Sequence, residues 1–119
     1  MNAGKTPQIY QRWDVVVVPY PLTNDGMGGR RRPALVVCRE DLPRDYGLYW
    51  LLMITAASHT GQNADVAIDD WEAANLPSAA VIRTTKIITV SQHQILRKLG
   101  TLAPGDQMRA TLELSRFIG

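Results

Sequence analysis

Three consecutive arginines, Arg30, Arg31 and Arg32, are the residues of this chain whose types and spacing most clearly suggest chemistry. They end the segment 21–32, whose three glycines predict an open loop in which the backbone can approach a partner closely. Guanidinium groups form forked hydrogen bonds that suit phosphate oxygens. The triplet therefore predicts a site for a phosphate backbone. The alternative is that it only solubilises the start of a strand or pairs with acidic side chains.

Other polar residues are assigned ordinary roles. Cys38 ends an apolar stretch without an identified base beside it, so we expect a small buried side chain rather than a nucleophile. His59 is expected to be a solvated loop histidine. Asp69 and Asp70 lack a third ligand at useful spacing and are expected to open a helical turn. No metal and no cofactor are predicted.

Length and composition favour one small globular domain. The chain has 119 residues, of which 45% are hydrophobic and 20% are charged, which is enough to bury a core without disulfide staples. Its net charge of +2 is too small to indicate nucleic-acid binding by itself. The single cysteine excludes an internal disulfide, and neither a secretory signal nor a membrane-spanning apolar run is recognised. We therefore expect a cytoplasmic protein without a membrane partner.

Short β-branched and aliphatic runs predict about five or six strands. The valine run at 15–18 should be buried on both faces, and Pro33 suits the first position of a strand, where no ladder donor is lost. Residues 1–11 are expected to form a flexible arm, and 12–119 a single domain. The predicted strands occupy 15–20, 33–38, 48–55, 80–83 and 86–90, with 64–68 pairing beside 48–55.

The tail of the chain predicts one amphipathic helix. Pro104 suits the first turn, and Asp106 complements the helix dipole. Apolar residues then recur at helical spacing, and Met108, Leu112 and Ile118 are expected to pack on the sheet. Many short strands followed by one helix predict a mainly β fold, a small curled antiparallel sheet capped by that helix.

Several motifs, in order, resemble those of the MazF/PemK family of toxins. Asp14, a valine run and a proline lead through a glycine-containing loop into Arg-Arg-Pro-Ala-Leu-Val-Val at 31–37. Downstream, Thr55 stands where that family places a threonine at a strand end. The segments 76–87 and 99–102 and the final helix extend the resemblance over residues 12–118. Each motif alone is only moderately specific.

The resemblance implies an SH3-like antiparallel β-barrel with a C-terminal helix, usually a homodimer. It also implies a metal-independent endoribonuclease that cleaves single-stranded RNA and is inhibited by a cognate antitoxin protein. By position, Arg32 matches the family's catalytic arginine and Thr55 its catalytic threonine. Arg83 matches an arginine that contacts RNA in some members. The expected RNA-binding residues are Arg30, Arg31, Arg83, Thr85 and Lys86.

Cleavage by the RNA 2′-hydroxyl requires stabilisation of the charge on the phosphorane and in-line geometry of the attacking and leaving oxygens. We assign Arg32 to that charge and Thr55 to a hydrogen bond with a nonbridging oxygen, because an arginine rarely gives up its proton. A general base is not evident in the sequence.

Two positions depart from the family pattern. Thr85 stands where many relatives carry an aspartate, and it cannot ionise. Trp13 replaces the common glycine before Asp14. The missing carboxylate favours the alternative function, a noncatalytic SH3-like barrel that binds an antitoxin, RNA or another protein such as gyrase.

Overall fold

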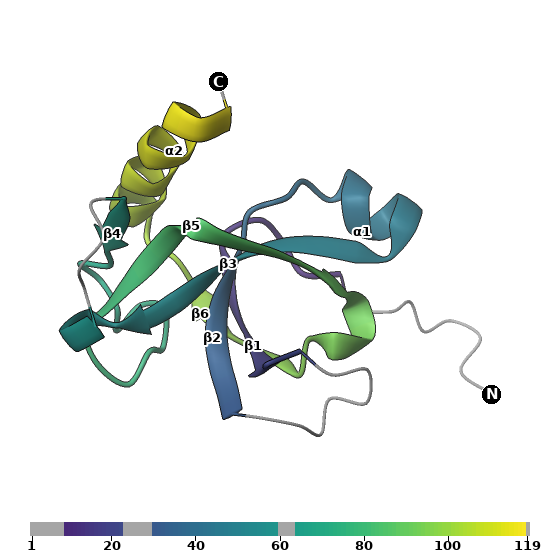
Figure 1. Ribbon diagram of the computed structural model, residues 1–119, viewed down its shortest axis with the longest axis horizontal. Helices are drawn as coiled ribbons and strands as arrows, with labels where there is room; N and C mark the ends of the chain where they lie inside the picture. The colour runs from purple at the N-terminus through teal and green to yellow at the C-terminus, as the bar shows by residue number, and fades with distance from the viewer. Residues whose placement is uncertain (1–8, 23–29, 60–63, 119) are drawn as a thin grey trace.

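The computed structural model describes residues 9–22, 30–59 and 64–118. Over these residues the chain forms six strands, two α-helices and two short 3-10 helices (Figure 1). In chain order they are β1 (Asp14–Tyr20), β2 (Arg30–Val36), α1 (Asp41–Tyr46), β3 (Leu48–Ala56), η1 (Ala57–His59), β4 (Asp65–Ala67), β5 (Ala80–Ser91), η2 (Gln92–Gln94), β6 (Arg97–Thr101) and α2 (Pro104–Ile118).

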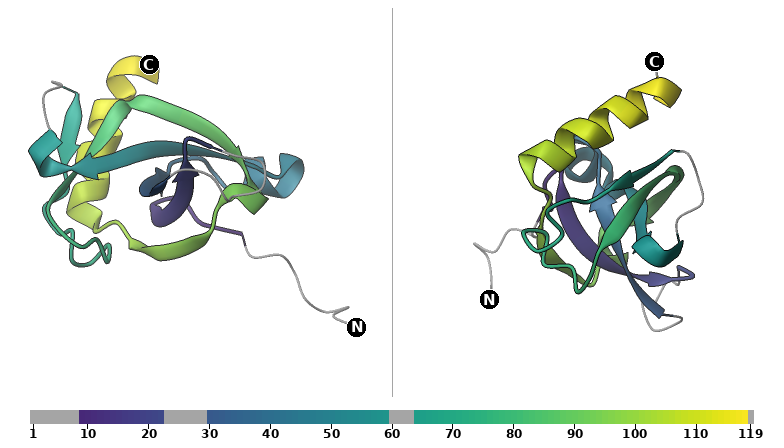
Figure 2. Two further views of the ribbon diagram at one scale, coloured as in Figure 1. Left: turned by 60° about the horizontal axis from the view of Figure 1, so that its bottom comes forward. Right: turned by 90° about the vertical axis from the view of Figure 1, so that its left-hand side faces the viewer.

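The six strands form one antiparallel sheet in the order β4-β5-β3-β2-β1-β6. The sheet curls, and α2 lies across the end formed by β4 and β5, whereas α1 lies at the opposite end of β3 (Figures 1 and 2). This arrangement confirms the expected mainly β fold with a C-terminal helix. In the part of the chain that the structure describes, no helix is long and apolar enough to cross a membrane.

The valine run of β1 contributes to two separate hydrophobic clusters. Val15 packs in a cluster that includes Ala110 and Leu114 of α2. Val16 and Val18 point to the other face and pack in a second cluster, which includes residues of β2, β3 and β5 and Ile95 after η2. Alternate side chains of a strand face opposite sides, so both faces of β1 are covered, as the unbroken run predicted.

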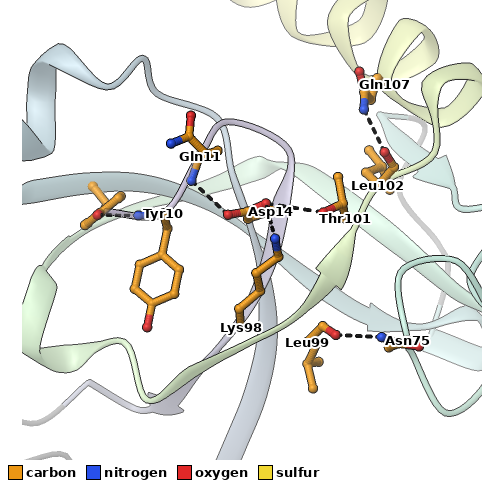
Figure 3. Close-up of polar contacts among 10 residues, drawn as sticks. Tyr10, Gln11, Asp14, Asn75, Lys98, Leu99, Thr101, Leu102 and Gln107 are labelled. Carbon is orange, nitrogen blue, oxygen red and sulfur yellow. Dashed lines mark hydrogen bonds and ion pairs between the residues drawn. The ribbon is translucent and has the colours of Figure 1, made fainter. Parts of the chain in front are cut away.

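Polar contacts of the Asp14 side chain link the start of β1 to β6 (Figure 3). Its side chain is only 6% exposed, and its carboxylate accepts the backbone N–H of Gln11 at 2.8 Å. Lys98 Nζ lies 3.2 Å from Oδ1, and Thr101, the ladder partner of Asp14, donates its hydroxyl to the same oxygen at 3.4 Å. A buried carboxylate is stable when it is paired and hydrogen-bonded in this way.

Trp13 adopts a left-handed backbone conformation, with φ of 78°. Its N–H donates to Val36 at 2.8 Å and its carbonyl accepts from Leu102 at 2.9 Å. Glycine takes this conformation without steric cost, which explains why a glycine suits this position in the resembled family. Here a partly buried indole replaces it and packs against the cluster of Val15.

Three details of the expected strand pattern are wrong. The arginine triplet belongs to β2 rather than to the preceding loop, because Arg30, Arg31 and Arg32 pair with the end of β1. β4 pairs with β5 and not with the 48–55 strand, since β5 lies between them. The strands expected at 80–83 and 86–90 are one strand, β5, whose pairing with β3 is interrupted by an irregularity.

One helix was not predicted, and the expected packing face of the other is wrong. The connection at 41–46 forms α1, ended by Gly47 with φ of 68°. In α2 the buried residues are Asp106, Ala110 and Leu114. The expected core stripe therefore faces outward, with Met108 66%, Leu112 63% and Ile118 74% exposed.

The segment 69–75 is a series of turns. Asp70 Oδ1 accepts the N–H of Ala73 at 3.2 Å, which is a local turn contact. The backbone N–H groups of Asp69 and Asp70 both donate to the buried carboxylate of Asp106, at 3.0 Å each. Asp106 therefore joins this turn to the first turn of α2. Among the described residues no group of three or more potential metal ligands occurs.

Candidate active site

The antiparallel pairing of β2 with β3 brings Arg32 and Thr55 together. Ala34 pairs with Met53 in that ladder. Arg32 lies two residues before Ala34 and Thr55 two residues after Met53, and both line the same cavities. Both side chains are partly buried. Two polar residues that are distant in the sequence thus meet at one end of the sheet.

A first cavity of about 280 Å³ opens at this end of the sheet. One wall is the start of β2, and a second wall is the end of β3 around Thr55. The third wall is the proline-containing segment before β5. The residues that line the first cavity are Arg30, Arg31, Arg32, Pro33, Ile54, Thr55, Ala56, Leu76, Pro77, Ser78 and Ala80.

A second cavity of about 170 Å³ adjoins the first. Arg32, Ile54 and Thr55 line both cavities, so these three residues form the boundary between them. Lys86 lies over the ring of Tyr20, 4.5 Å from its centroid, at this second cavity. The residues that line the second cavity are Tyr20, Arg32, Met53, Ile54, Thr55, Arg83 and Lys86.

Arg83 forms a two-pronged ion pair with Asp65. Its Nε donates to Oδ1 at 3.1 Å, and its Nη2 donates to Oδ2 at 2.9 Å. These hydrogen bonds raise the pKa of the Arg83 guanidinium, against a smaller opposing effect of burial. Arg83 is therefore engaged in an ion pair, and it still lines the second cavity.

The electrostatics of the two cavities are dominated by cations. Four arginines and one lysine line them, whereas the described lining residues include no carboxylate and no imidazole. Fixed cations and a hydroxyl in a partly enclosed site can stabilise negative charge that develops on a phosphoryl group. Such a site attracts and orients a phosphodiester, but it supplies no evident general base.

The remaining candidates are placed as follows. Thr85 is exposed and, among the described residues, does not line either cavity. His59 ends η1, close after β3. Cys38 is buried, and burial raises the pKa of its thiol, which disfavours the reactive thiolate. Its environment agrees with the expected structural role.

Sequence reasoning missed four residues that contribute to the site. Tyr20 was read only as a strand end, and Pro77 and Ser78 only as part of a resembling loop. Asp65 was not singled out at all, because its importance lies in the cross-strand pairing with Arg83. The only indication of Asp65 in the sequence was that it is a polar residue in a short segment with β-branched neighbours.

A second group of arginines, Arg12, Arg39 and Arg44, lines a cavity of about 320 Å³ near α1. Acidic residues accompany them, and Arg44 contacts both Asp41 and Asp45 at 3.6 Å. The charge of this cavity is therefore partly balanced, unlike that of the two cavities beside Arg32.

The fold and the cationic cavities define a small β-rich protein suited to a phosphodiester ligand. The family model of the PemK-like, MazF-like toxin of type II toxin-antitoxin systems matches residues 11–117. The chain therefore belongs to this toxin family. A comparison of the sequence with curated proteins finds no match.

Solved structures with the same fold include three that cover most of the chain. An endoribonuclease in complex with its cognate antitoxin, from a mycobacterial species, is 16% identical with a TM-score of 0.73, covering 94% of this chain and 95% of its own. MazF from Deinococcus radiodurans is 17% identical with a TM-score of 0.72, covering 94% and 98%. The Mycobacterium tuberculosis toxin MazF-mt6 is 16% identical with a TM-score of 0.69, covering 87% and 93%.

Proposed function

We propose that this toxin is a metal-independent endoribonuclease that cleaves single-stranded RNA, with Arg32 and Thr55 as its catalytic residues. The observation that carries the proposal is their joint position on the boundary of two cation-lined cavities. A scissile phosphate on this boundary would have RNA on both sides of it. The proposed RNA-binding residues are Arg30, Arg31, Arg83 and Lys86, which line the cavities, together with the exposed Thr85 of β5.

The proposed reaction is an internal transesterification. The 2′-oxygen loses its proton and bonds to the adjacent phosphorus, while the bond from phosphorus to the 5′-oxygen breaks and that oxygen gains a proton. The products carry a 2′,3′-cyclic phosphate and a 5′-hydroxyl. Arg32 stabilises the negative charge on the phosphorane oxygens, and the Thr55 hydroxyl donates to one nonbridging oxygen.

Because no carboxylate or imidazole lines the described cavities, we assign the protein's contribution to positioning and charge stabilisation. Protons then exchange with solvent. Removing one such donor in other enzymes costs about 100-fold to 1000-fold in rate, so an arginine and a hydroxyl together can supply a large acceleration.

We also propose two protein partners. The family is that of type II toxin-antitoxin systems, and one structural relative is described as bound to its cognate antitoxin. A cognate antitoxin that covers the cationic cavities would prevent RNA from entering. A homodimer is the second proposed assembly, and sedimentation at several protein concentrations tests it.

A noncatalytic binding module is the second candidate function. The observation in its favour is the absence of a carboxylate from the described lining of both cavities. In that case the same cations would bind RNA or an acidic partner without bond cleavage.

The purified protein, incubated with RNA in EDTA, tests the proposal. We expect fragments with 2′,3′-cyclic phosphate ends, and a substrate with 2′-deoxyribose at the cleaved position should remain intact. The Arg32→Ala variant should not cut. Cleavage by Arg32→Ala at the parent's rate would indicate a contaminating nuclease, and an intact substrate with retained binding would favour the noncatalytic module.

A further inference from the structure

Asp65 and Arg83 are direct cross-strand partners in the ladder of β4 and β5. The Asp65 side chain is only 5% exposed, and that of Arg83 is 21% exposed. Both carboxylate oxygens bind the same guanidinium, through Nε and Nη2. Two parallel hydrogen bonds fix the plane of a guanidinium, which a single contact does not do.

The short strand β4, which carries Asp65, is held in place by contacts of its neighbouring residues. Thr84, next to Arg83, donates its buried hydroxyl to the carbonyl of Ala64 at 2.7 Å. Val66, next to Asp65, is buried in the core opposite Ile82. The three-residue strand β4 is thus fixed on both sides of Asp65. A rigid acceptor of this kind can hold a long, flexible arginine in one orientation.

We propose that Asp65 is a positioning residue that holds Arg83 at the second cavity for contact with an RNA phosphate. The inference rests on the proposed function and deepens it. Asp65 does not line the cavity among the described residues, whereas Arg83 does, beside Arg32 and Thr55. Asp65 therefore acts through Arg83 and not by contact with the substrate.

Charge and positioning predict opposite effects of removing the carboxylate. Asp65 offsets one positive charge at a cation-rich site, so charge alone predicts that Asp65→Asn binds RNA more tightly. Positioning predicts weaker binding, because an amide cannot accept both guanidinium hydrogen bonds. The sign of the change in affinity distinguishes the two explanations.

The test measures the affinity of the full chain for a fluorescent 2′-O-methyl RNA by anisotropy, which requires no cleavage. We expect the dissociation constant of Asp65→Asn to rise about tenfold, the effect of losing one charged hydrogen bond. With a cleavable RNA, KM should rise more than kcat falls. Glu113→Gln is the matched control, because it removes a carboxylate paired with Arg116 on α2, and its affinity should equal that of the parent.

Two further variants exclude a merely structural role. Arg83→Lys keeps the charge but loses the fork, and it should weaken binding like Asp65→Asn even if the latter folds poorly. In the Arg83→Ala background, Asp65→Asn should have no additional effect. Additive losses, unchanged affinity or tighter binding by Asp65→Asn would overturn the inference.

Failure of the proposed function gives a different result. A parent protein that binds the 2′-O-methyl RNA but cuts no cleavable RNA contradicts the nuclease activity, while the affinities of the variants still decide the role of Asp65. A parent that does not bind RNA overturns both.

Discussion

Arg32 on β2 and Thr55 on β3 line the same two cavities and form the boundary between them. The residues that neighbour Arg32 and Thr55 in the chain do not determine that the two lie close together. The pairing of β2 with β3, which ends at Ala34 and Met53, brings the two strand ends that carry them to the same cavities. Their roles are therefore separable by substitutions that preserve the register.

Arg32→Lys tests whether the geometry of the guanidinium matters beyond its charge. Lysine keeps the charge but cannot form a two-pronged contact with phosphate oxygens. We expect kcat for RNA cleavage to fall about 100-fold, the effect of losing one preorganised donor, with a smaller change in KM. Arg97→Lys, at an exposed position on β6, is the control and should retain parental kinetics. Equal rates for Arg32→Lys and the parent would contradict the assignment.

Thr55→Val removes one hydroxyl with little change in shape. If Thr55 donates to the phosphorane, kcat should fall about 100-fold while the far-ultraviolet circular dichroism stays unchanged. Thr89→Val is the matched control, because Thr89 is an exposed strand residue on β5 opposite Trp50. A similar loss in both variants would indicate a general effect on the sheet.

Arg30 and Arg31 are expected to guide the phosphate backbone without taking part in the chemistry. Both are exposed, whereas Arg32 is partly buried. Alanine at either position should raise KM and lower the slope of log affinity against log salt by about one, with kcat nearly unchanged. Titrations between low and moderate salt measure this slope. An unchanged slope would show that the residue does not contact a phosphate.

The strand pattern of the first half was predictable because it depends on local chemistry. Four successive β-branched valines favour a strand, whereas Pro33, expected at the first position of its strand, is the fourth residue of β2. α1 was not predicted, because a helix of six residues is too short to show a periodic apolar pattern; its third residue, Pro43, is tolerated in the first turn.

The outward face of α2 could not be predicted from periodicity alone. Helical spacing shows that a face is apolar but not which neighbour covers it. The sheet contacts the side of Ala110 and Leu114, so Met108 and Leu112 remain exposed. The pairing of Asp65 with Arg83 was hidden for the same reason, since it depends on a strand register between distant segments.

Gly100 is required because a side chain there has no space. A Cβ at this position would lie 2.7 Å from both the carbonyl carbon and the oxygen of Ala74. Gly100→Ala should therefore lower the free energy of unfolding by about 1–3 kcal/mol, measured by urea denaturation. Gly105→Ala is the matched control: its Cβ meets nothing within 4 Å, and it lies in α2. It should stabilise the protein by about 0.5–1 kcal/mol.

Stability should fall in alkaline solution because of buried neutral groups. Burial raises the pKa of Cys38 and of Tyr49. Above a pH of about 8.5, the ordinary pKa of cysteine, the unfolded chain loses a proton that the folded chain retains. The free energy of unfolding is thus fully maintained below that pH and declines as pH rises toward the folded-state pKa.

Urea denaturation between pH 7.5 and pH 9.5, an interval of about one unit on either side of the cysteine pKa, measures this dependence. Cys38→Ala should flatten the decline. Leu114→Ala, which creates a cavity without removing a titratable group, should lower stability at every pH and leave the slope unchanged. Parallel slopes for the parent and Cys38→Ala would contradict the explanation.

The pairing of β1 with β6 joins the beginning of the sheet to nearly the end of the chain, with Asp14 opposite Thr101. Contacts between such distant segments form slowly, so the sheet cannot be completed on a ribosome until β6 has emerged. A chain interrupted before Arg97 leaves the outer edge of β1 without its partner. That edge carries the valine run, and an unpaired apolar strand recruits strands of other molecules. Incomplete copies of this toxin are therefore expected to aggregate rather than to persist as soluble fragments.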